Sequence, residues 1–322
     1  GFPLSGEGAA GTSGLNPSLA SRVLDLYPEM TVQQVNGFIL KQMRAGKTDA
    51  QIFSRLQTLS REWDELELTL DHWTAAGDGA RAAAASAIKE CWRNAPLVEE
   101  NPNLGALSMF LDAELPVLKA DFSHVLGLDV QGPGITPIAI NELLERCPEV
   151  QSLSLMGGVM RNVPRALSQM HRLTRLTLQL VIPSTDFSSR LRALGNLEEL
   201  NLSIQGLIED ESKLDLAQMS KLRALTIDAP QLKNWPTGLL ELPDLERLDL
   251  KKTAIKILPA DLFRGHEQLL RGLSLDWGKF SESGLTSVYE SIKSSSGVDL
   301  LRESIGREYC QRVLPRLGPW KT

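Results

Sequence analysis

Leucine and other apolar residues recur along the middle of the chain in one short pattern, apolar-x-x-Leu-x-apolar. Seven copies occur, and each begins 23 to 25 residues after the one before it. The copies begin at Val125, Val150, Leu173, Leu197, Leu222, Leu245 and Leu270. Because apolar positions alternate with polar ones, each copy predicts a short strand with one buried face and one open face. A fixed period of this length is typical of stacked repeats that share a continuous core.

The rest of each repeat fits a solenoid of leucine-rich repeats. Proline follows an apolar residue in three return segments, at Val163-Pro164, Trp235-Pro236 and Leu258-Pro259, and proline fixes φ and ends strand pairing. The turn position that is usually asparagine in such repeats is here Pro133, Gly158, Val181, Gln205, Pro230, Thr253 and Gly278. The turns must therefore satisfy their backbone groups through neighbouring amides or water. Whether a weaker eighth copy, over residues 104–109, precedes the array is left open.

Helical patterns flank the repeats and divide the chain into four parts. Residues 1–15 are rich in glycine and small polar residues, which predicts a flexible leader or a cloning remnant. Residues 16–98 are expected to form a helical domain, residues 99–280 hold the repeats, and residues 281–322 form a helical cap or begin a following domain. The expected fold class is α/β: a leucine-rich-repeat solenoid of seven to eight repeats with an N-terminal helical bundle and a C-terminal helical cap.

One helix of the N-terminal part has a regular apolar seam with steps of four and three residues. The seam consists of Ile52, Leu56, Leu59, Trp63, Leu66, Leu70 and Trp73. Such spacing fits either a coiled-coil dimer or packing inside a helical bundle. Two tryptophans and the neighbouring helical segments favour packing within one chain, so a monomer is expected.

Composition and motifs exclude several classes of function. The net charge of −6 argues against a general nucleic-acid binder, and no apolar run approaches the roughly 20 residues of a membrane span. The four histidines are isolated, and no glycine-rich phosphate loop is present. We therefore expect no metal, no cofactor and no catalytic residue in this chain. His124 is expected to make a structural hydrogen bond at the first repeat.

Three cysteines lie far apart, at Cys91, Cys147 and Cys310, without the spacing of a zinc site or a redox pair. This pattern favours a reducing environment. Cys91 and Cys147 lie in apolar contexts and are expected to be packing residues. Arginines near Cys310 in the sequence could activate a thiol, but on an amphipathic helix they more often mark a solvated face beside a buried thiol. We expect Cys310 to be such a buried thiol.

The outward-facing strand positions predict a binding surface. They carry mainly small polar groups, and charged residues gather toward the C-terminal repeats. The candidate contact residues are Arg175, Glu199, Asn201, Arg247, Asp249, Lys251, Asp276 and Trp277. Arginine and tryptophan are favoured anchors of protein interfaces, so a protein partner is expected. For any single residue of this set, a merely solvated position is the competing interpretation.

Four motifs around the first repeat resemble a known family. They are Arg22-Val-Leu-Asp-Leu-Tyr-Pro-Glu-Met, Glu62-Trp-Asp-Glu-Leu followed by Trp73, Ile88-Lys-Glu-Cys-Trp-Arg and Ala120-Asp-Phe-Ser-His-Val. In this order they resemble the segment before and within the leucine-rich repeats of large bacterial effector or toxin-like proteins of the Pseudomonas type. Those proteins are similar to IpaH ubiquitin ligases and end in a novel E3 ligase (NEL) domain. The resemblance covers about residues 16–280.

The resemblance implies a role in ubiquitin transfer without supplying its catalytic site. In such ligases a cysteine in a Cys-x-Asp motif accepts ubiquitin in a domain that follows the repeats, and the repeats select the substrate. No cysteine of this chain has an aspartate two residues later. The chain is therefore expected to be the substrate-binding and regulatory region of such a ligase.

Partners and localisation follow from the same resemblance. It implies a host protein as substrate, a ubiquitin-loaded E2 bound through a catalytic domain outside this sequence, and a protein secreted or delivered into the host cytoplasm. Two alternatives remain open. The chain could be a stand-alone interaction scaffold without an enzymatic role, or belong to an effector with an unrelated C-terminal ligase domain.

Overall fold

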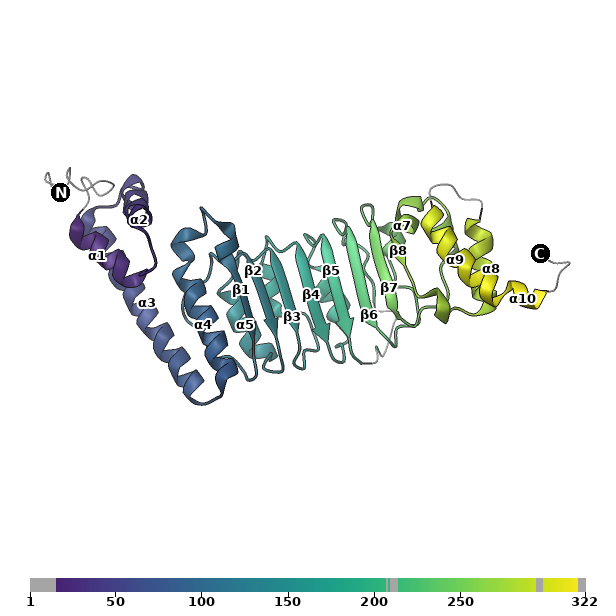
Figure 1. Ribbon diagram of the computed structural model, residues 1–322, viewed down its shortest axis with the longest axis horizontal. Coiled ribbons are helices and arrows are strands. Elements are labelled where there is room, and N and C mark those ends of the chain that lie inside the picture. Colours follow the sequence, from purple (N-terminus) through teal and green to yellow (C-terminus); the bar gives the residue numbers. More distant parts are fainter. Residues whose placement is uncertain (1–15, 207, 209–213, 294–297, 318–322) are drawn as a thin grey trace.

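The computed structural model describes residues 16–206, 208, 214–293 and 298–317. The expected leader, residues 1–15, lies outside the described residues. The molecule is elongated, with a parallel sheet in the middle and helices at both ends (Figure 1). The division into four parts stays a prediction.

Eight strands form one parallel sheet in sequential order. They are β1 (Ala106–Phe110), β2 (Gly127–Gln131), β3 (Ser152–Met156), β4 (Arg175–Leu180), β5 (Glu199–Ile204), β6 (Ala224–Ala229), β7 (Arg247–Thr253) and β8 (Leu273–Ser274). The weak first copy is a true repeat, because Leu107 and Met109 of β1 are buried and pair with β2. The leucine-rich-repeat solenoid predicted from the sequence is confirmed.

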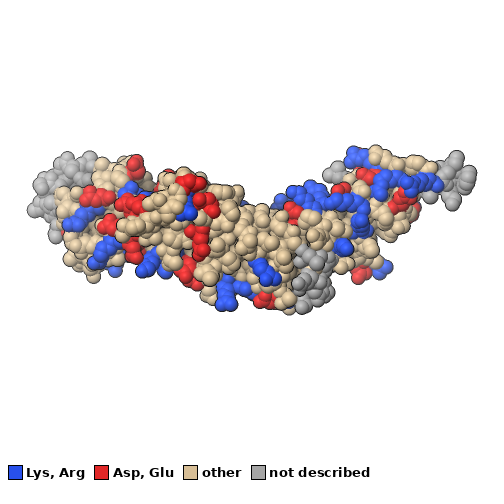
Figure 2. All heavy atoms as spheres, turned by 90° about the horizontal axis from the view of Figure 1, so that it is seen from below, with Lys and Arg blue, Asp and Glu red and all other residues tan. Residues whose placement is uncertain are grey.

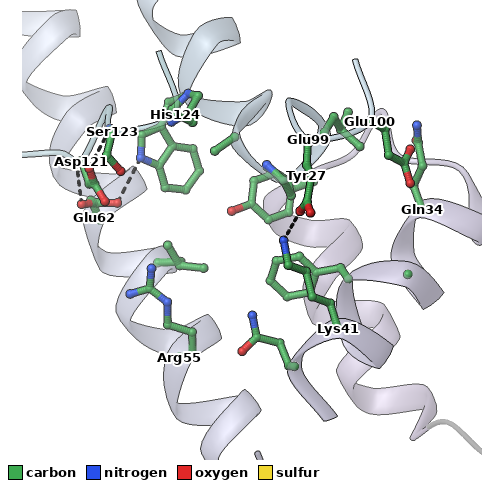
Figure 3. A pocket seen from close by; sticks show the side chains of 18 of the residues that line it. Tyr27, Gln34, Lys41, Arg55, Glu62, Glu99, Glu100, Asp121, Ser123 and His124 are labelled. Carbon is green, nitrogen blue, oxygen red and sulfur yellow. Dashed lines mark hydrogen bonds and ion pairs between the residues drawn. The ribbon is translucent and has the colours of Figure 1, made fainter. Parts of the chain in front are cut away.

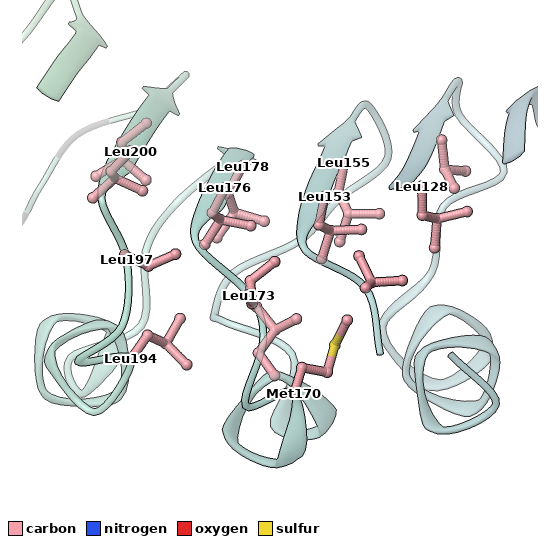
Figure 4. Close-up of a cluster of buried hydrophobic side chains, with 14 of the residues drawn as sticks. Leu128, Leu153, Leu155, Met170, Leu173, Leu176, Leu178, Leu194, Leu197 and Leu200 are labelled. Carbon is pink, nitrogen blue, oxygen red and sulfur yellow. The ribbon is translucent and has the colours of Figure 1, made fainter. Parts of the chain in front are cut away.

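The pattern leucines form the core between the sheet and the return segments. In Figure 4, leucines of successive strands lie side by side, and Met170, Leu173, Leu194 and Leu197 approach them from the returns. The returns contain the helices α5 (Pro137–Glu145), α6 (Phe187–Arg192) and α7 (Glu267–Arg271) and the 3-10 helices η4 (Arg165–Gln169), η6 (Leu239–Glu241) and η7 (Ala260–Phe263). Each repeat therefore buries its apolar face only by stacking on its neighbours.

The turns after the strands pair their backbones without asparagine, as expected. The Gly132 N–H donates to the Met156 carbonyl at 3.0 Å, and the Gln205 N–H donates to the Leu180 carbonyl at 2.9 Å. Gly157 has a φ of 126°, and a Cβ there would lie 2.4 Å from the Gly132 oxygen. Glycine is thus required where two neighbouring turns approach each other this closely.

Four helices precede the sheet: α1 (Pro17–Leu26), α2 (Val32–Arg44), α3 (Asp49–Ala75) and α4 (Gly79–Arg93). Asn16 and Thr31 cap α1 and α2, and Gly46, with a φ of 85°, follows the end of α2. All seven seam residues of α3 are buried within this one chain. This confirms packing inside the chain over a coiled-coil seam.

The N-terminal helices are fastened to the first repeats by polar contacts as well as by packing. Helix α4 packs against β1 (Figure 1), and the 3-10 helices η2 (Ala95–Leu97) and η3 (Pro102–Gly105) connect the two. The His124 Nε2 lies 2.7 Å from the Cys91 carbonyl oxygen and donates to it. Burial lowers the pKa of His124, against a smaller opposing effect of that bond. The predicted structural hydrogen bond of His124 is confirmed.

The C-terminal end is covered by η8 (Trp277–Lys279), α8 (Glu282–Ile292), α9 (Asp299–Arg312) and α10 (Leu314–Leu317). One face of α9 and the residue after it are buried, through Leu301, Ile305, Tyr309 and Val313. Among the described residues, no helix is both long and apolar enough to cross a membrane.

Candidate functional site

The register of the sheet places the predicted contact residues in columns on its open face. Arg175 is the partner of Glu199 in the first column, and Asn201 is the partner of Thr177 in the second. Asp249 continues the second column on β7. The alternation of apolar and polar positions in each strand turns these side chains away from the core.

The strand pairing is irregular beside Lys251, the third outward-facing position that the pattern predicts on β7. The register shifts between Thr226 and Asp228, so that Asp228 pairs with Lys252 instead of Lys251. Strand β7 thus carries an extra residue there, and both lysines are exposed. An irregularity of one residue changes which side chain lies on a given face. Lys252 was missed as a candidate contact for this reason.

Charged side chains form a chain of ion pairs across β4, β5 and β7. Glu199 lies between two arginines, 3.7 Å from Arg175 and 3.6 Å from Arg247. On the same face, Lys251 lies 3.6 Å from Asp249. We call these five residues the charged ladder. The side chains of Arg175 and Arg247 are 65% and 70% exposed, so both guanidinium groups keep donors available to a partner.

A hollow of about 370 Å³ lies beside the charged ladder on the same face. Asn201 and Asp249 line it, and Asn201 donates to the Thr177 hydroxyl at 3.2 Å. Asp228 and Lys252 also line it, and neither has an ion-pair partner within the described ranges. In Figure 2 the outline is hollowed on one side, and Lys and Arg gather along that edge over the C-terminal repeats.

Trp277 does not serve as the exposed anchor that the sequence predicted. Its side chain is 6% exposed and packs against Phe280, with ring centroids 4.9 Å apart. The chain leaves the sheet after Ser274 and enters η8. Asp276 is exposed but caps this short helix by accepting from the Gly278 N–H at 3.2 Å. Both residues therefore belong to the C-terminal closure of the core rather than to the columns.

The three cysteines differ in burial, and none of them is in a disulfide. Cys91 and Cys147 are buried, and burial raises the pKa of each thiol to about 12, as expected for packing residues. Cys310 is exposed, so the prediction of a buried thiol was wrong. The reason is rotation along α9: Tyr309 takes the buried face, and the next residue points about 100° away from it. In the described residues, no group of three or more His, Cys, Asp or Glu could hold a metal ion.

Solved structures with a similar fold are leucine-rich-repeat proteins. An internalin of Listeria monocytogenes matches with a TM-score of 0.41 and 17% identity, over 62% of this chain and 54% of that chain. A leucine-rich-repeat protein of Leptospira interrogans matches with a TM-score of 0.36 and 22% identity, over 55% of this chain and 43% of that one. The matched region spans about half the length of these solved chains. No family model and no curated protein matches the chain.

Proposed function

We propose that the open face of the repeat sheet binds a protein partner through the charged ladder. The observation that carries this proposal is Glu199 held between two arginines that are mostly exposed. The shared carboxylate restrains both guanidinium groups before binding, and restraint of this kind lowers the entropy lost on association. Arginine is also among the residues that most often dominate the energy of a protein interface.

The shape and charge of the face favour a protein over other ligands. The sheet offers side chains from several parallel strands at a repeating separation of about 4.8 Å. Both signs of charge occur on it, so a partner with a mixed surface can satisfy arginine and aspartate together. The net charge of −6 does not favour a phosphate backbone.

A charge-reversal pair tests this proposal. The double variant Arg247→Glu, Lys251→Glu should lose a partner that the wild-type chain captures from host-cell extract. The matched control is Arg264→Glu, an 81% exposed arginine after η7 in the return segment, which should keep it. Loss of the same partner from both variants, or from neither, would contradict binding by the open face.

We propose further that this binding selects substrate for a bacterial effector of the IpaH-like ubiquitin-ligase type. The support is the linked order of the four motifs, three of which lie in or beside α1, α3 and α4, while the fourth directly precedes β2. The proposal includes a host protein as substrate, a ubiquitin-loaded E2 as partner of a catalytic domain outside this sequence, and delivery into the host cytoplasm. Three free cysteines suit that reducing compartment.

Thioester formation tests the ligase role. The longest natural form of the protein and residues 1–322 are each incubated with ubiquitin, E1 and E2, and a reducible ubiquitin adduct is sought. An adduct on the longer form alone supports a targeting role for this chain. An adduct on neither form supports a scaffold without enzymatic role. An adduct on residues 1–322 that disappears in Cys310→Ser would instead place the reactive thiol on α9.

A further inference from the structure

A second cavity lies at the other end of the molecule, where the N-terminal helices meet the first repeats. We call it the junction pocket; its volume is about 620 Å³, within the range of small-molecule sites. Helices α2 and α3 form two of its sides, and the segments after α4 and before β2 close it (Figure 3). Phe38, Leu59 and Trp92 give it apolar walls. Its lining residues come from four separate segments, and each of the four motifs around the first repeat contributes at least one of them.

Tyr27 presents a polar group to this pocket. The residue is 4% exposed, its ring stacks on Trp92 with centroids 5.8 Å apart, and Phe38 lies at 5.9 Å on a tilted plane. Within the described part of the chain its hydroxyl has no hydrogen-bond partner, and Figure 3 shows it turned toward the open centre. Burial raises the pKa of Tyr27 to about 12, so the hydroxyl stays protonated and can donate. The hydroxyl oxygen is not fully enclosed, so it can donate to a ligand oxygen in the pocket.

The acidic groups around the pocket are mostly engaged already. Both carboxylate oxygens of Glu62 accept hydrogen bonds, from the Trp92 Nε1 at 3.0 Å and from the Asp121 N–H at 2.9 Å. Glu99 forms an ion pair with Lys41. The carboxylate of Asp121 accepts in turn from the Ser123 N–H at 2.8 Å. The negative charges near the centre are therefore bound to donors of the protein itself.

Arg55 is one of two pocket arginines, with Arg44, that no ion pair engages among the described residues. It lies on the α3 side of the pocket, and no ion pair involves it among the residues described. Its charge acts on the Tyr27 hydroxyl, whose pKa it lowers against the larger effect of burial. The guanidinium and the hydroxyl thus act on the same region. Glu100 lies on the opposite side of the view in Figure 3, and the two carboxylates on the side of Arg55, those of Glu62 and Asp121, are held by donors of the protein.

We propose that the junction pocket binds a small aromatic carboxylate. Its ring packs against Phe38 and Trp92, and its carboxylate accepts hydrogen bonds from the Tyr27 hydroxyl and the Arg55 guanidinium. A planar guanidinium matches a carboxylate in geometry, and such charge-assisted bonds are stronger than neutral ones. Aromatic rings add offset or edge contacts to the burial of apolar area. The site is separate from the charged ladder and does not depend on the function proposed for it.

Titration with naphthalene-2-carboxylate, followed by isothermal calorimetry on the full chain, tests this site. Wild-type protein should bind the carboxylate at least about tenfold more tightly than naphthalene-2-carboxamide, which keeps the ring and loses the charge. Tyr27→Phe and Arg55→Gln should each weaken carboxylate binding about tenfold. The control Arg61→Gln changes an exposed arginine of the same helix, outside the pocket, and should bind as wild type does.

Three results would overturn the proposal. They are absence of carboxylate binding at millimolar concentration, equal affinity for the carboxamide, and unchanged affinity in both pocket variants. Arg55 is exposed, so its replacement leaves the fold intact even if Tyr27→Phe loosens the helices. Circular dichroism of each variant separates loss of binding from loss of fold.

Discussion

The two ends of the repeat array are closed by different interactions. At the N-terminal end, α4 covers β1, and an aromatic cluster of Tyr27, Trp63 and Trp92 lies behind it, with ring centroids 5.3 to 5.8 Å apart along the cluster. At the C-terminal end, one side chain of α9 holds the last turn: Arg312 donates to the carbonyls of Trp277, Gly278 and Phe280. Both closures bury apolar side chains, and the C-terminal one adds a single guanidinium group that donates to three backbone carbonyls.

The difference follows from how far the sheet extends at each end. Strand β1 pairs with β2 over all five of its residues, so its outer edge and apolar face need a cover, which α4 supplies. Strand β8 has only two residues, and the backbone beyond it has left the ladder. Its carbonyls need donors from elsewhere, and Arg312 provides them. Where strand pairing stops early, a long cationic side chain takes the place of the missing partner strand.

Trp92→Ala should weaken the N-terminal closure and cause the largest loss in the free energy of unfolding. Trp92 is 2% exposed, and large-to-small changes of buried tryptophan cost about 3–5 kcal/mol of the free energy of unfolding. Urea unfolding measures the loss. In hydrogen exchange, the amides of β1 and β2 should lose protection before those of β7, since each repeat depends on its nearest neighbours.

A control for this change is Trp235→Ala, at a half-buried tryptophan in a return segment. Its effect should be smaller and should not expose the amides of β1. If the amides of β7 lost protection as early as those of β1 in Trp92→Ala, the two ends would unfold together, which would contradict independent closures.

Arg312→Met should open the C-terminal closure with a smaller loss of about 2–3 kcal/mol. Methionine keeps the apolar stem, but three carbonyls lose a charged donor, and bonds to charged groups contribute about 1.5–3 kcal/mol. Arg307→Met is the matched control on the same helix, because Arg307 is exposed and surface changes stay within about 0.5 kcal/mol. Equal unfolding curves for the two variants would show that Arg312 does not hold the last turn.

The array itself could be predicted from the sequence because its signal is repeated. Each of the seven clear copies places leucine at the spacing of a stacked strand. The weak copy, which contains Leu107 and Met109, was left open and is decided by its pairing with β2. The helical ends were predicted from local patterns, such as the spacing of Ile52, Leu56 and Leu59 in the seam. Both signals depend only on residues that are close together in the sequence, so they can be recognised before the fold is known.

The candidate site was less predictable. The predictions for it failed where contacts between residues distant in the sequence decide the position of a side chain. The strand pattern alone placed Lys251 in a column, but the irregularity on β7 is set by pairing with β6. Trp277 was expected at the surface because it follows a strand position, whereas a short 3-10 helix turns it into the C-terminal core. The four motifs contain lining residues of the junction pocket, but the pocket itself was not predicted, since Tyr27 and Arg55 approach each other only after α1 and α3 pack.

Glu62→Gln should weaken the N-terminal closure without removing apolar area, by about 1–2 kcal/mol. The two oxygens of Glu62 accept from Trp92 and Asp121, and an amide leaves one of these two donors facing an NH₂ group. Glu65→Gln, at an exposed position of the same helix, is the control and should change the midpoint of urea unfolding little. If the two variants behaved alike, packing alone would hold the N-terminal helices.

Lowering the pH should destabilise the N-terminal closure and leave the C-terminal closure unchanged. This change in stability should be smaller than those caused by the substitutions. Burial lowers the pKa of His124 in the folded chain, so below the ordinary value of about 6.5 the unfolded chain binds a proton that the folded chain does not. The contribution of neutral His124 to stability is therefore full above pH 6.5 and is lost as pH falls through the folded pKa. Asp121 and Glu62 oppose this by raising the pKa, and burial outweighs them.

Hydrogen exchange and urea unfolding at pH 7.5 and pH 5.5 measure this dependence at both ends. Protection of the β1 and β2 amides should fall with pH in wild type and much less in His124→Gln, which keeps a donor near the Cys91 carbonyl and does not titrate. Residues 281–322 contain no histidine, so α8 and α9 act as the internal reference. A pH dependence that persisted in His124→Gln, or appeared equally in α9, would assign the acid effect to carboxylates and remove pH as a distinction between the two closures.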